Sequence, residues 1–506
     1  MCGFFITNSK DVTSKDESRI EKLLRFRGPD CSSGLVEHNG WKAYHSRLSI
    51  IDVQAGTNQP MIDQNGGMLV FNGEILNYKE LGHKYFDADF KGDTELLSAL
   101  LRSNKLNINE LDGFYAFVYI DKSGSLTHAA RDSFGVKPLF FYETEDNISF
   151  CSEPIVLKEL FGLGTNEVAI QEYYATRAPI FSGSYFEGVK SVEPGTCKIT
   201  GKYFDCSDYL SSDYSELTLS EIKSAITKGL ETRMVSEVPV GLLLSKGIDS
   251  NLLRSIGNFD KYYTTGFAGD EDLEFLRQEH IPGLTVIEVN EKEYKAAFDY
   301  LLNLRGEPMS VPNEVLLYLV SKQAAKDGVK VLLSGEGADE FFGGYDRIFR
   351  WAAKTNHFDL NEFLGYYCYI KPEKGSELFK TFEKLFSGVS LDSPFEYVRW
   401  FFIRYHMPVL FRRLDFALMA AGVEGREPIA NMHTFVKSIK YSPDSLMNER
   451  VGKKPLRDLI IPFMGQEFAY DKKVGFPVDL TKIFDNQNNR SSYELWFSEN
   501  LKVLNR

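Results

Sequence analysis

The chain reads Val-Pro-Val-Gly-Leu-Leu-Leu-Ser-Lys-Gly-Ile-Asp-Ser at residues 238–250. The run at 238–244 is apolar, as expected of a strand that is buried on both faces of a parallel sheet. Ser245, Lys246 and Gly247 then make a polar turn, and a helix opens after it. A glycine-bearing turn at this place presents backbone N–H groups to an anion. The stretch therefore predicts an α/β unit with an anion site at the carboxyl end of its strand.

The same alternation continues on both sides of this stretch. A helix is predicted between about residue 216 and the strand, and further strands are predicted at 262–267, 284–289 and 329–333. Helices fit between these strands. Alternating strands and helices indicate a parallel sheet that is covered on both faces. From about residue 347 the chain is predicted to be mainly helical and rich in aromatic residues.

The first 200 residues have a different pattern. Alternating and turn-flanked segments predict strands at 41–51, 68–72, 115–119, 126–131 and 139–142. Leucines recurring at helical spacing predict one helix at 93–103. A stretch rich in glycine, serine and aspartate at 197–213 separates this part from the rest. We therefore expect a β-rich domain over residues 2–200 and an α/β domain over residues 214–506.

The composition limits the function classes. The chain has 506 residues, of which 43% are hydrophobic and 25% charged, so it is globular. Its net charge of −13 argues against broad nucleic-acid binding. It has no apolar run of the ~20 residues that span a membrane and no signal-peptide pattern, so we expect a cytoplasmic protein. The cysteines and histidines have neither C-x-x-C nor H-E-x-x-H spacing, so neither a zinc ribbon nor a metalloprotease is predicted.

Cys2 becomes the first residue once Met1 is removed. Its thiol would then lie beside its own α-amine, which titrates near ~8 and can act as a general base. This is the arrangement of an N-terminal nucleophile. The alternative is that Cys2 is only a small residue that permits removal of Met1.

The segments around Cys2 favour the nucleophile. They are Arg-Gly-Pro-Asp at 27–30, Arg-Leu-Ser-Ile-Ile-Asp at 47–52, Asn-Gln-Pro at 58–60, Phe-Asn-Gly-Glu-Ile at 71–75, Gly-Asp-Thr-Glu at 92–95, Arg-Asp at 131–132 and Gly-Val-Lys-Pro-Leu at 135–139. In this order they resemble the class II glutamine amidotransferase domain of asparagine synthetases, over residues 2–195. The resemblance implies an α+β N-terminal nucleophile fold with αββα layers.

The resemblance also implies roles in binding glutamine. Arg47 would hold the α-carboxylate, Asp93 the α-ammonium, and Cys2 would attack the side-chain amide. The Asn72 side chain and the Gly73 backbone N–H would stabilise the oxyanion. The implied glutamine-binding residues are Arg47, Leu48, Ile50, Ile51, Asn72, Gly73, Glu74 and Asp93.

The opening stretch has a resemblance of its own. Residues 245–250 resemble the pyrophosphate loop Ser-Gly-Gly-x-Asp-Ser of ATP pyrophosphatases, which cleave ATP between the α and β phosphates. This implies an adenine-nucleotide hydrolase-like α/β domain with a helical C-terminal part. Lys246 stands where the family has glycine. It would add a charge for phosphate, or crowd the site if the backbone there needs a positive φ.

The chain also reads Ser-Gly-Glu-Gly-Ala-Asp-Glu-Phe-Phe-Gly-Gly-Tyr at 334–345, which resembles the asparagine synthetase signature. Asp249 and Asp339 are the implied Mg²⁺ ligands, and Glu336 the implied proton-transfer group. The implied ATP-binding residues are Leu244, Ser245, Lys246, Gly247, Asp249, Ser250, Thr265, Gly266, Ser334 and Gly335. Residues 471–477 resemble the family's Arg-x-Lys-x-Gly-Phe segment, with Lys473 on the catalytic lysine and Asp471 in place of the arginine.

The acceptor side departs most from the family. The implied acceptor pocket holds Glu336, Asp339, Glu340, Glu424 and Arg426. Nearby, polar residues of the family pattern are replaced by Leu414, Phe416, Leu418, Gly422 and Asn431, and its Asp-Glu-Pro motif becomes Gly-Glu-Pro at 306–308. A pocket for free aspartate needs polar partners, so their loss favours another carboxylate.

We therefore expect an enzyme that uses glutamine, ATP and Mg²⁺ to amidate a carboxylate, such as a sugar uronate of O-antigen synthesis. L-aspartate is the alternative acceptor. A glutaminase with an inactive synthetase half, which Lys246 would explain, and a non-catalytic regulatory or scaffold protein remain as other classes. The resemblance alone implies a homodimer.

Overall fold

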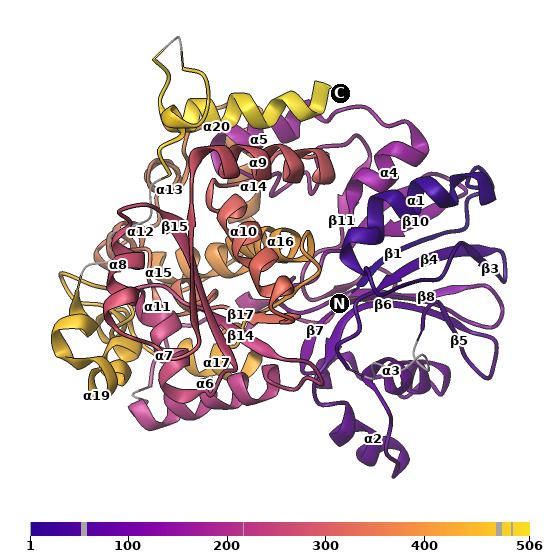
Figure 1. The fold of residues 1–506 in the computed structure, drawn as a ribbon, viewed down its shortest axis with the longest axis horizontal. Helices are drawn as coiled ribbons and strands as arrows, with labels where there is room; N and C mark the ends of the chain where they lie inside the picture. Colours follow the sequence, from indigo (N-terminus) through magenta and orange to yellow (C-terminus); the bar gives the residue numbers. More distant parts are fainter. Residues whose placement is uncertain (1, 52–57, 216, 472–477, 487–488, 506) are drawn as a thin grey trace.

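The computed structural model describes residues 2–51, 58–215, 217–471, 478–486 and 489–505. The N-terminal part of the chain forms two antiparallel sheets, and the C-terminal part forms one parallel sheet with many helices. The two parts lie side by side and share a broad contact (Figure 1). This architecture confirms the predicted fold class.

The two N-terminal sheets lie face to face. The first has the order β11-β9-β10-β1-β4-β2, with β3 also paired to β4, and the second has the order β13-β12-β8-β7-β6-β5. The strands of the first are β1 (Cys2–Thr7), β2 (Cys31–Ser32), β3 (Val36–His38), β4 (Trp41–Arg47), β9 (Phe140–Glu143), β10 (Ile148–Cys151) and β11 (Val189–Ser191). Those of the second are β5 (Met61–Ile62), β6 (Met68–Ile75), β7 (Gly113–Ile120), β8 (Leu126–Arg131), β12 (Thr196–Cys197) and β13 (Gly201–Lys202).

Helices cover the outer face of each N-terminal sheet. Between the sheets, Phe4 and Ile6 of β1 pack with Val70 of β6 and Val118 of β7. The alternate residues of the same strands face outward because successive side chains of a strand point to opposite faces. They pack on α1 (Glu17–Leu24) and α4 (Pro154–Phe161) at the first sheet, and on α2 (Tyr78–Phe86) and α3 (Asp93–Arg102) at the second. The result is the expected αββα layering, followed by α5 (Glu167–Thr176).

The C-terminal sheet has five parallel strands in the order β16-β15-β14-β17-β18. They are β14 (Val240–Leu243), β15 (Lys261–Phe267), β16 (Leu284–Val289), β17 (Val331–Leu333) and β18 (Glu424–Arg426). The helices are α6 (Leu219–Arg233), α7 (Ile248–Ile256), α8 (Glu271–Gln278), α9 (Glu291–Arg305), α10 (Asn313–Lys326), α11 (Ala338–Phe342), α12 (Asp346–Lys354), α13 (Leu360–Tyr367), α14 (Glu377–Ser387), α15 (Pro394–Phe401), α16 (Met407–Met419), α17 (Met432–Ser438), α18 (Pro443–Leu446), α19 (Lys454–Tyr470) and α20 (Ser492–Leu501).

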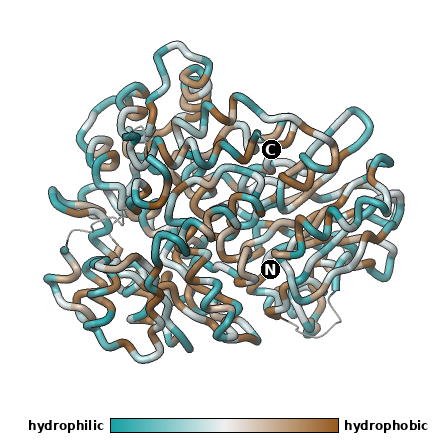
Figure 2. The backbone as a smooth tube through the Cα atoms, turned by 45° about the horizontal axis from the view of Figure 1, so that its top comes forward, coloured by the Kyte–Doolittle hydropathy of each residue, from teal (hydrophilic) through white to brown (hydrophobic). Residues whose placement is uncertain are grey.

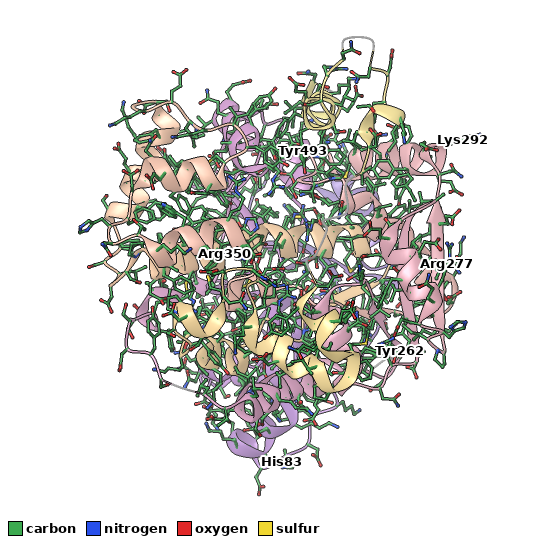
Figure 3. All side chains as sticks on the ribbon, turned by 90° about the vertical axis from the view of Figure 1, so that its left-hand side faces the viewer. His83, Tyr262, Arg277, Lys292, Arg350 and Tyr493 are labelled. Atoms are coloured by element: carbon green, nitrogen blue, oxygen red, sulfur yellow. The ribbon has the colours of Figure 1, made fainter. Side chains whose placement is uncertain are left out.

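Both faces of the parallel sheet are buried. Leu242 packs in a cluster with Ile226 of α6 and Leu253 of α7. Leu332 of the neighbouring strand packs on the other side with Ala324 of α10 and with α16. Hydrophobic segments accordingly gather in the interior and hydrophilic ones follow the outer loops (Figure 2). Figure 3 shows the polar side chains of His83, Arg277 and Lys292 at the edge of the molecule.

The predicted strands at 262–267 and 284–289 match β15 and β16 within one residue, and the predicted helix at 93–103 matches α3. The predicted strand at 41–51 ends earlier, at Arg47. The sequence did not predict β18, because three residues reading Glu-Gly-Arg carry no strand pattern. Across the described ranges, no helix is both long and apolar enough to cross a membrane.

Candidate functional site

Cys2 lies where the two N-terminal sheets meet. It is the first residue of β1 and pairs with Arg47 of β4 in the antiparallel register. Its backbone N–H donates a hydrogen bond to Oδ1 of Asn72, on β6 of the other sheet, at 3.0 Å. The fold thus brings together three of the predicted residues from three strands.

Asn72 and Gly73 are consecutive residues of β6, and Asn72 accepts the hydrogen bond from the Cys2 N–H. The Asn72 side chain is buried, and its Nδ2 has no hydrogen-bond partner among the described residues. Gly73 has φ 138°, and a Cβ there would lie 2.0 Å from the carbonyl oxygen of Phe114. Only glycine fits this backbone and this space. The side chain that bonds to the Cys2 N–H therefore also carries a buried amide donor without a partner, which can stabilise negative charge.

Two buried carboxyl groups lie next to this pair. Asp93, at the start of α3, accepts hydrogen bonds from the backbone N–H groups of Ile75 at 2.9 Å and Thr94 at 2.7 Å. Burial and the nearby Asp93 raise the pKa of Glu74 well above its ordinary value, and burial raises the pKa of Asp93 as well. A cation beside these two carboxyl groups would stabilise their charged forms. This suits the ammonium of an amino acid.

Arg47 lies opposite Cys2 in the strand register. Its buried side chain donates to Oδ1 of Asn58 at 3.0 Å and lies near the carbonyl of Ile51. Leu48, Ile50 and Ile51 are buried beside it. Burial raises the pKa of the Cys2 thiol, while the Leu48 backbone N–H and the Arg47 guanidinium act to lower it. The thiol therefore needs a base to become a nucleophile.

A cavity of about 1290 Å³ lies in the C-terminal half, at the carboxyl ends of β14, β15 and β17. Ligands bind at this edge in α/β sheets. The predicted residues that line the cavity are Leu244, Ser245, Lys246, Gly247, Asp249, Ser250, Thr265, Ser334, Gly335, Glu336 and Asp339. Gly266 is not part of its lining, and Lys473 lies outside the described residues.

The turn after β14 accommodates its lysine. The Ser245 N–H donates to Oγ of Ser250 at 3.2 Å, and the Gly247 N–H donates to Oγ of Ser245 at 3.1 Å. Lys246 is not among the described residues with positive φ. The backbone therefore does not require glycine at this position, and the predicted crowding by Lys246 does not arise from its φ.

Lys453 joins the two predicted metal ligands. Its Nζ lies 2.7 Å from Oδ2 of Asp249 and 2.6 Å from Oδ1 of Asp339. Burial alone would lower the pKa of Lys453, but the two carboxylates raise it, so the ammonium stays charged. The sequence did not indicate this residue, since it is one lysine in a Gly-Lys-Lys-Pro run.

The Asp249 and Asp339 carboxylates fit a magnesium ion that is shared with phosphate. Oδ1 of Asp249 is buried and has no hydrogen-bond partner within the described ranges. In those ranges no group of three or more His, Cys, Asp or Glu side chains could hold a metal ion. Mg²⁺ commonly binds through one or two carboxylates together with substrate phosphates. The donor set therefore suits Mg²⁺ bound with ATP.

Other cavity groups are poised for polar ligands. Nη2 of Arg413, on α16, donates to Oε1 of Glu336 at 2.6 Å, and both residues line the cavity. The Thr265 hydroxyl is buried there without a hydrogen-bond partner in the described part of the chain. An unpaired buried hydroxyl is costly unless a ligand satisfies it.

Three predicted acceptor residues are not part of the cavity lining. Arg426 donates to Glu424 at 2.5 Å and to the carbonyls of Arg233 and Val235, so β18 uses both side chains to fix the sheet edge. Glu340 accepts from the Tyr345 hydroxyl, and burial raises the pKa of Glu340 to about 8. None of the three is part of the cavity lining.

Most of the changed positions in the acceptor segment, residues 414–431, lie outside the cavity. Of its five changed positions, only Leu414 lines the cavity. Phe416 and Leu418 are fully buried in hydrophobic clusters, and the Asn431 side chain caps α17. Because these side chains pack inside the protein, the predicted change in the acceptor pocket rests on Leu414 alone.

The comparisons with known proteins cover both halves. A family described as glutamine amidotransferase domain matches residues 1–210, and one described as asparagine synthase matches residues 221–503. The glutamine-hydrolysing asparagine synthetase 1 of Bacillus subtilis strain 168 is 31% identical over 74% of this chain and 64% of its own length. Asparagine synthetase 3 of the same strain is 25% identical over 94% of this chain and 87% of its own.

The match to the first of these relatives spans less than two thirds of its length. A solved structure titled as the allosteric regulatory enzyme of purine biosynthesis matches at 15% identity and a TM-score of 0.30, over 59% of this chain and 77% of that one. The asparagine synthase match alone covers more than half of the chain. On these matches, the chain belongs to the asparagine synthase family and carries a glutamine amidotransferase domain at its N-terminus.

Proposed function

We propose that the protein is a glutamine-dependent amidotransferase with a glutaminase domain at residues 2–200 and an ATP-dependent synthetase domain at residues 214–506. It would hydrolyse glutamine at Cys2 and use the ammonia to convert a carboxylate into an amide, with release of AMP and pyrophosphate. The observation that carries the proposal is that one chain holds both a buried cysteine bonded to Asn72, whose amide nitrogen has no partner among the described residues, and a cavity with Lys453 between two aspartates.

The first reaction needs no histidine. After removal of Met1, the α-amine of Cys2 takes the thiol proton, and the sulfur attacks the glutamine amide carbon. Asn72 Nδ2 and the Gly73 N–H stabilise the oxyanion. The intermediate collapses to a thioester with loss of ammonia, and water then releases glutamate. Arg47 pairs with the α-carboxylate, and Glu74 with Asp93 accepts the α-ammonium.

The second reaction takes place in the cavity. The acceptor carboxylate attacks the α-phosphate of ATP and pyrophosphate leaves. Ammonia then attacks the acyl carbon, AMP leaves, and Glu336 takes the surplus proton. Asp249 and Asp339 would hold Mg²⁺, which supplies charge neutralisation at the phosphates when bound. Lys453, and Lys473 in the segment outside the described residues, would offset negative charge.

Helix α16 supports a connection between the two reactions. Arg413 pairs with Glu336 at the cavity, and two residues on Asp415 pairs with Arg27 at 2.8 Å. Arg27 in turn donates from Nε to the carbonyl oxygen of Cys2 at 3.1 Å. Ammonia is protonated in water at neutral pH and is then not a nucleophile. A protected route past this helix would keep it reactive.

We propose two acceptors that an experiment can separate. A sugar uronate of O-antigen synthesis is supported by Leu414 at the cavity wall and by a volume of about 1290 Å³, which exceeds the ~300–1,000 Å³ of most ligand sites. L-aspartate is supported by the core position of Phe416 and Leu418 and by the relatives named asparagine synthetases.

The test is release of AMP and pyrophosphate with glutamine, Mg-ATP and a panel of aspartate, its analogues and nucleotide-linked uronic acids. Turnover with aspartate at ordinary synthetase rates would refute the uronate, and turnover with a uronate alone would refute aspartate. Glutamine hydrolysis without AMP from any acceptor would refute the synthetase reaction and leave the glutaminase. If the protein neither forms AMP nor hydrolyses glutamine, the result would favour a regulatory protein.

A further inference from the structure

Lys246 and Asp471 form an ion pair in the lining of this cavity. Nζ of Lys246 lies 3.1 Å from Oδ2 of Asp471, and both residues line the cavity. They are also the two positions at which the pyrophosphate loop and the C-terminal segment depart from the family pattern. One departure introduces a positive charge and the other removes one, and the structure brings the two together.

Hydrogen bonds from neighbouring residues hold the backbone at both residues. Lys246 follows β14 in a turn closed by the Ser245 hydrogen bonds described above, and that turn opens α7. Asp471 ends α19, where Nη1 of Arg457 donates to the carbonyls of Ala469 at 2.6 Å and Asp471 at 3.2 Å. Helices α7 and α19 pack on each other. The backbones of the two residues are therefore held in place by packed elements.

The Lys246 ammonium is accessible to a ligand in a way that Lys453 is not. The Lys246 side chain is 33% exposed, while that of Lys453 is 6% exposed and is engaged by two carboxylates. Elsewhere the cavity wall carries both signs of charge, and its cations besides Lys453 include Arg177, Arg413, Arg457 and Lys482. Its other carboxylates include Asp270, Glu271, Asp272, Glu288 and Glu291. A polyphosphate in this cavity needs a local cation, and the turn after β14 supplies one beside backbone N–H groups.

We propose that Lys246 binds the triphosphate of ATP and that Asp471 is a positioning residue that holds the Lys246 ammonium toward the cavity. The cation that the family places at position 471 is in this chain supplied from position 246. This inference rests on the proposed function, because it assumes that ATP is the ligand of the cavity.

The test is calorimetric binding of Mg²⁺ with a non-hydrolysable ATP analogue, and of adenosine, to the full chain. Lys246→Met should weaken binding of the analogue about tenfold, the effect of one hydrogen bond to a charged group. Adenosine binding should not change, which also shows that the variant is folded. The matched control is Lys454→Met, which removes a lysine paired with Asp458 at 2.9 Å outside the cavity lining.

Two further variants separate binding from positioning. Asp471→Asn should weaken binding of the analogue less than Lys246→Met does. The Lys246 ammonium is still present in this variant, but it has lost the carboxylate that positions it. Tighter binding would show that Asp471 competes for the ammonium and would overturn its positioning role. The double variant Lys246→Gly with Asp471→Arg returns the cation to position 471 and should recover most of the affinity.

The remaining outcomes also decide the proposal. Unchanged analogue affinity in Lys246→Met, or an equal loss for adenosine, would overturn phosphate binding by Lys246. Failure of the double variant to recover would overturn the relocation of the cation. If the unmodified chain binds neither ligand, ATP binding itself fails, and the proposed synthetase reaction fails with it.

Discussion

Gly344 shows how closely the cavity is built around its charges. A Cβ at this residue would lie 1.8 Å from Oδ1 of Asp339 and 2.2 Å from Cε of Lys453. Both partners would have to move, and the bridge to Asp249 would be lost with them. Both contacted atoms are side-chain ends, and they can give way only by leaving the ion pair, because Lys453 is buried.

We therefore expect Gly344→Ala to abolish AMP formation while glutamine hydrolysis at Cys2 continues. Gly365→Ala is the control, since a Cβ there meets nothing within 4 Å. Both activities are measured on each variant, as AMP and as glutamate. Normal AMP formation by Gly344→Ala would show that the Asp339–Lys453 contact is not needed.

Glu427 gives a prediction on pH. It is buried, its Oε2 has no hydrogen-bond partner in the described structure, and burial raises its pKa from 4.5 to about 7. Between these values the unfolded chain releases the proton and the folded chain keeps it. The folded state is therefore favoured below pH 4.5, and this advantage is lost as the pH rises to about 7.

Glu427→Gln removes the titration. Relative to this variant, the unmodified protein should lose up to about 3 kcal/mol of unfolding free energy between these pH values, at 1.36 kcal/mol per pKa unit. Denaturant midpoints at pH 4.5 and above pH 7 measure the difference. Parallel pH profiles for the two proteins would mean that Glu427 is ionised in the folded state throughout.

At the scale of elements, α16 joins the two halves through buried charge. Asp415 pairs with Arg27 at 2.8 Å and Lys137 at 3.3 Å, both from the N-terminal half and all three fully buried. Positive partners hold the pKa of Asp415 below its ordinary value although burial acts to raise it. Removing the Asp415 charge would take away the carboxylate that Lys137 pairs with, while Arg27 would keep Glu153 at 2.6 Å.

Asp415→Asn should therefore lower the unfolding free energy by on the order of 3 kcal/mol. The same substitution at Asp299, in an exposed pair with Lys295, should change it little. Denaturant titration of both variants gives the comparison. A small effect at Asp415 would indicate that water or a neighbouring group replaces the lost charge.

The elements also show what the sequence can and cannot predict. Buried strands such as β14 and helix α3 have strong periodicity, so their positions follow from pattern alone. The polar turn after β14 follows as well, because it lies between a buried strand and a helix. By contrast, the sequence predicts that Phe416 and Leu418 change the acceptor side, although their side chains pack in the core. A resemblance to a family shows which residues correspond along the chain, but it does not show whether each side chain points into the core or into the cavity.

Over the whole molecule, residues far apart in sequence build each site. The Cys2 site draws on β1, β4, β6 and α3, and the resemblance named all of these residues. Lys453 lies more than a hundred residues beyond Asp339, and its role follows only from packing of the C-terminal helices on the sheet. The pairing of Lys246 with Asp471 is likewise a consequence of how α19 lies against α7.

In the proposed reaction, two separate sites of one chain act in sequence. The most direct test is AMP formation by Cys2→Ala with glutamine or with an ammonium salt as nitrogen donor, using an acceptor that the unmodified protein accepts. We predict no amide with glutamine and near-normal amide and AMP with ammonium, because the substitution leaves the cavity untouched. Loss of both activities in a folded variant would contradict separable sites, and retained use of glutamine would contradict Cys2 as the nucleophile.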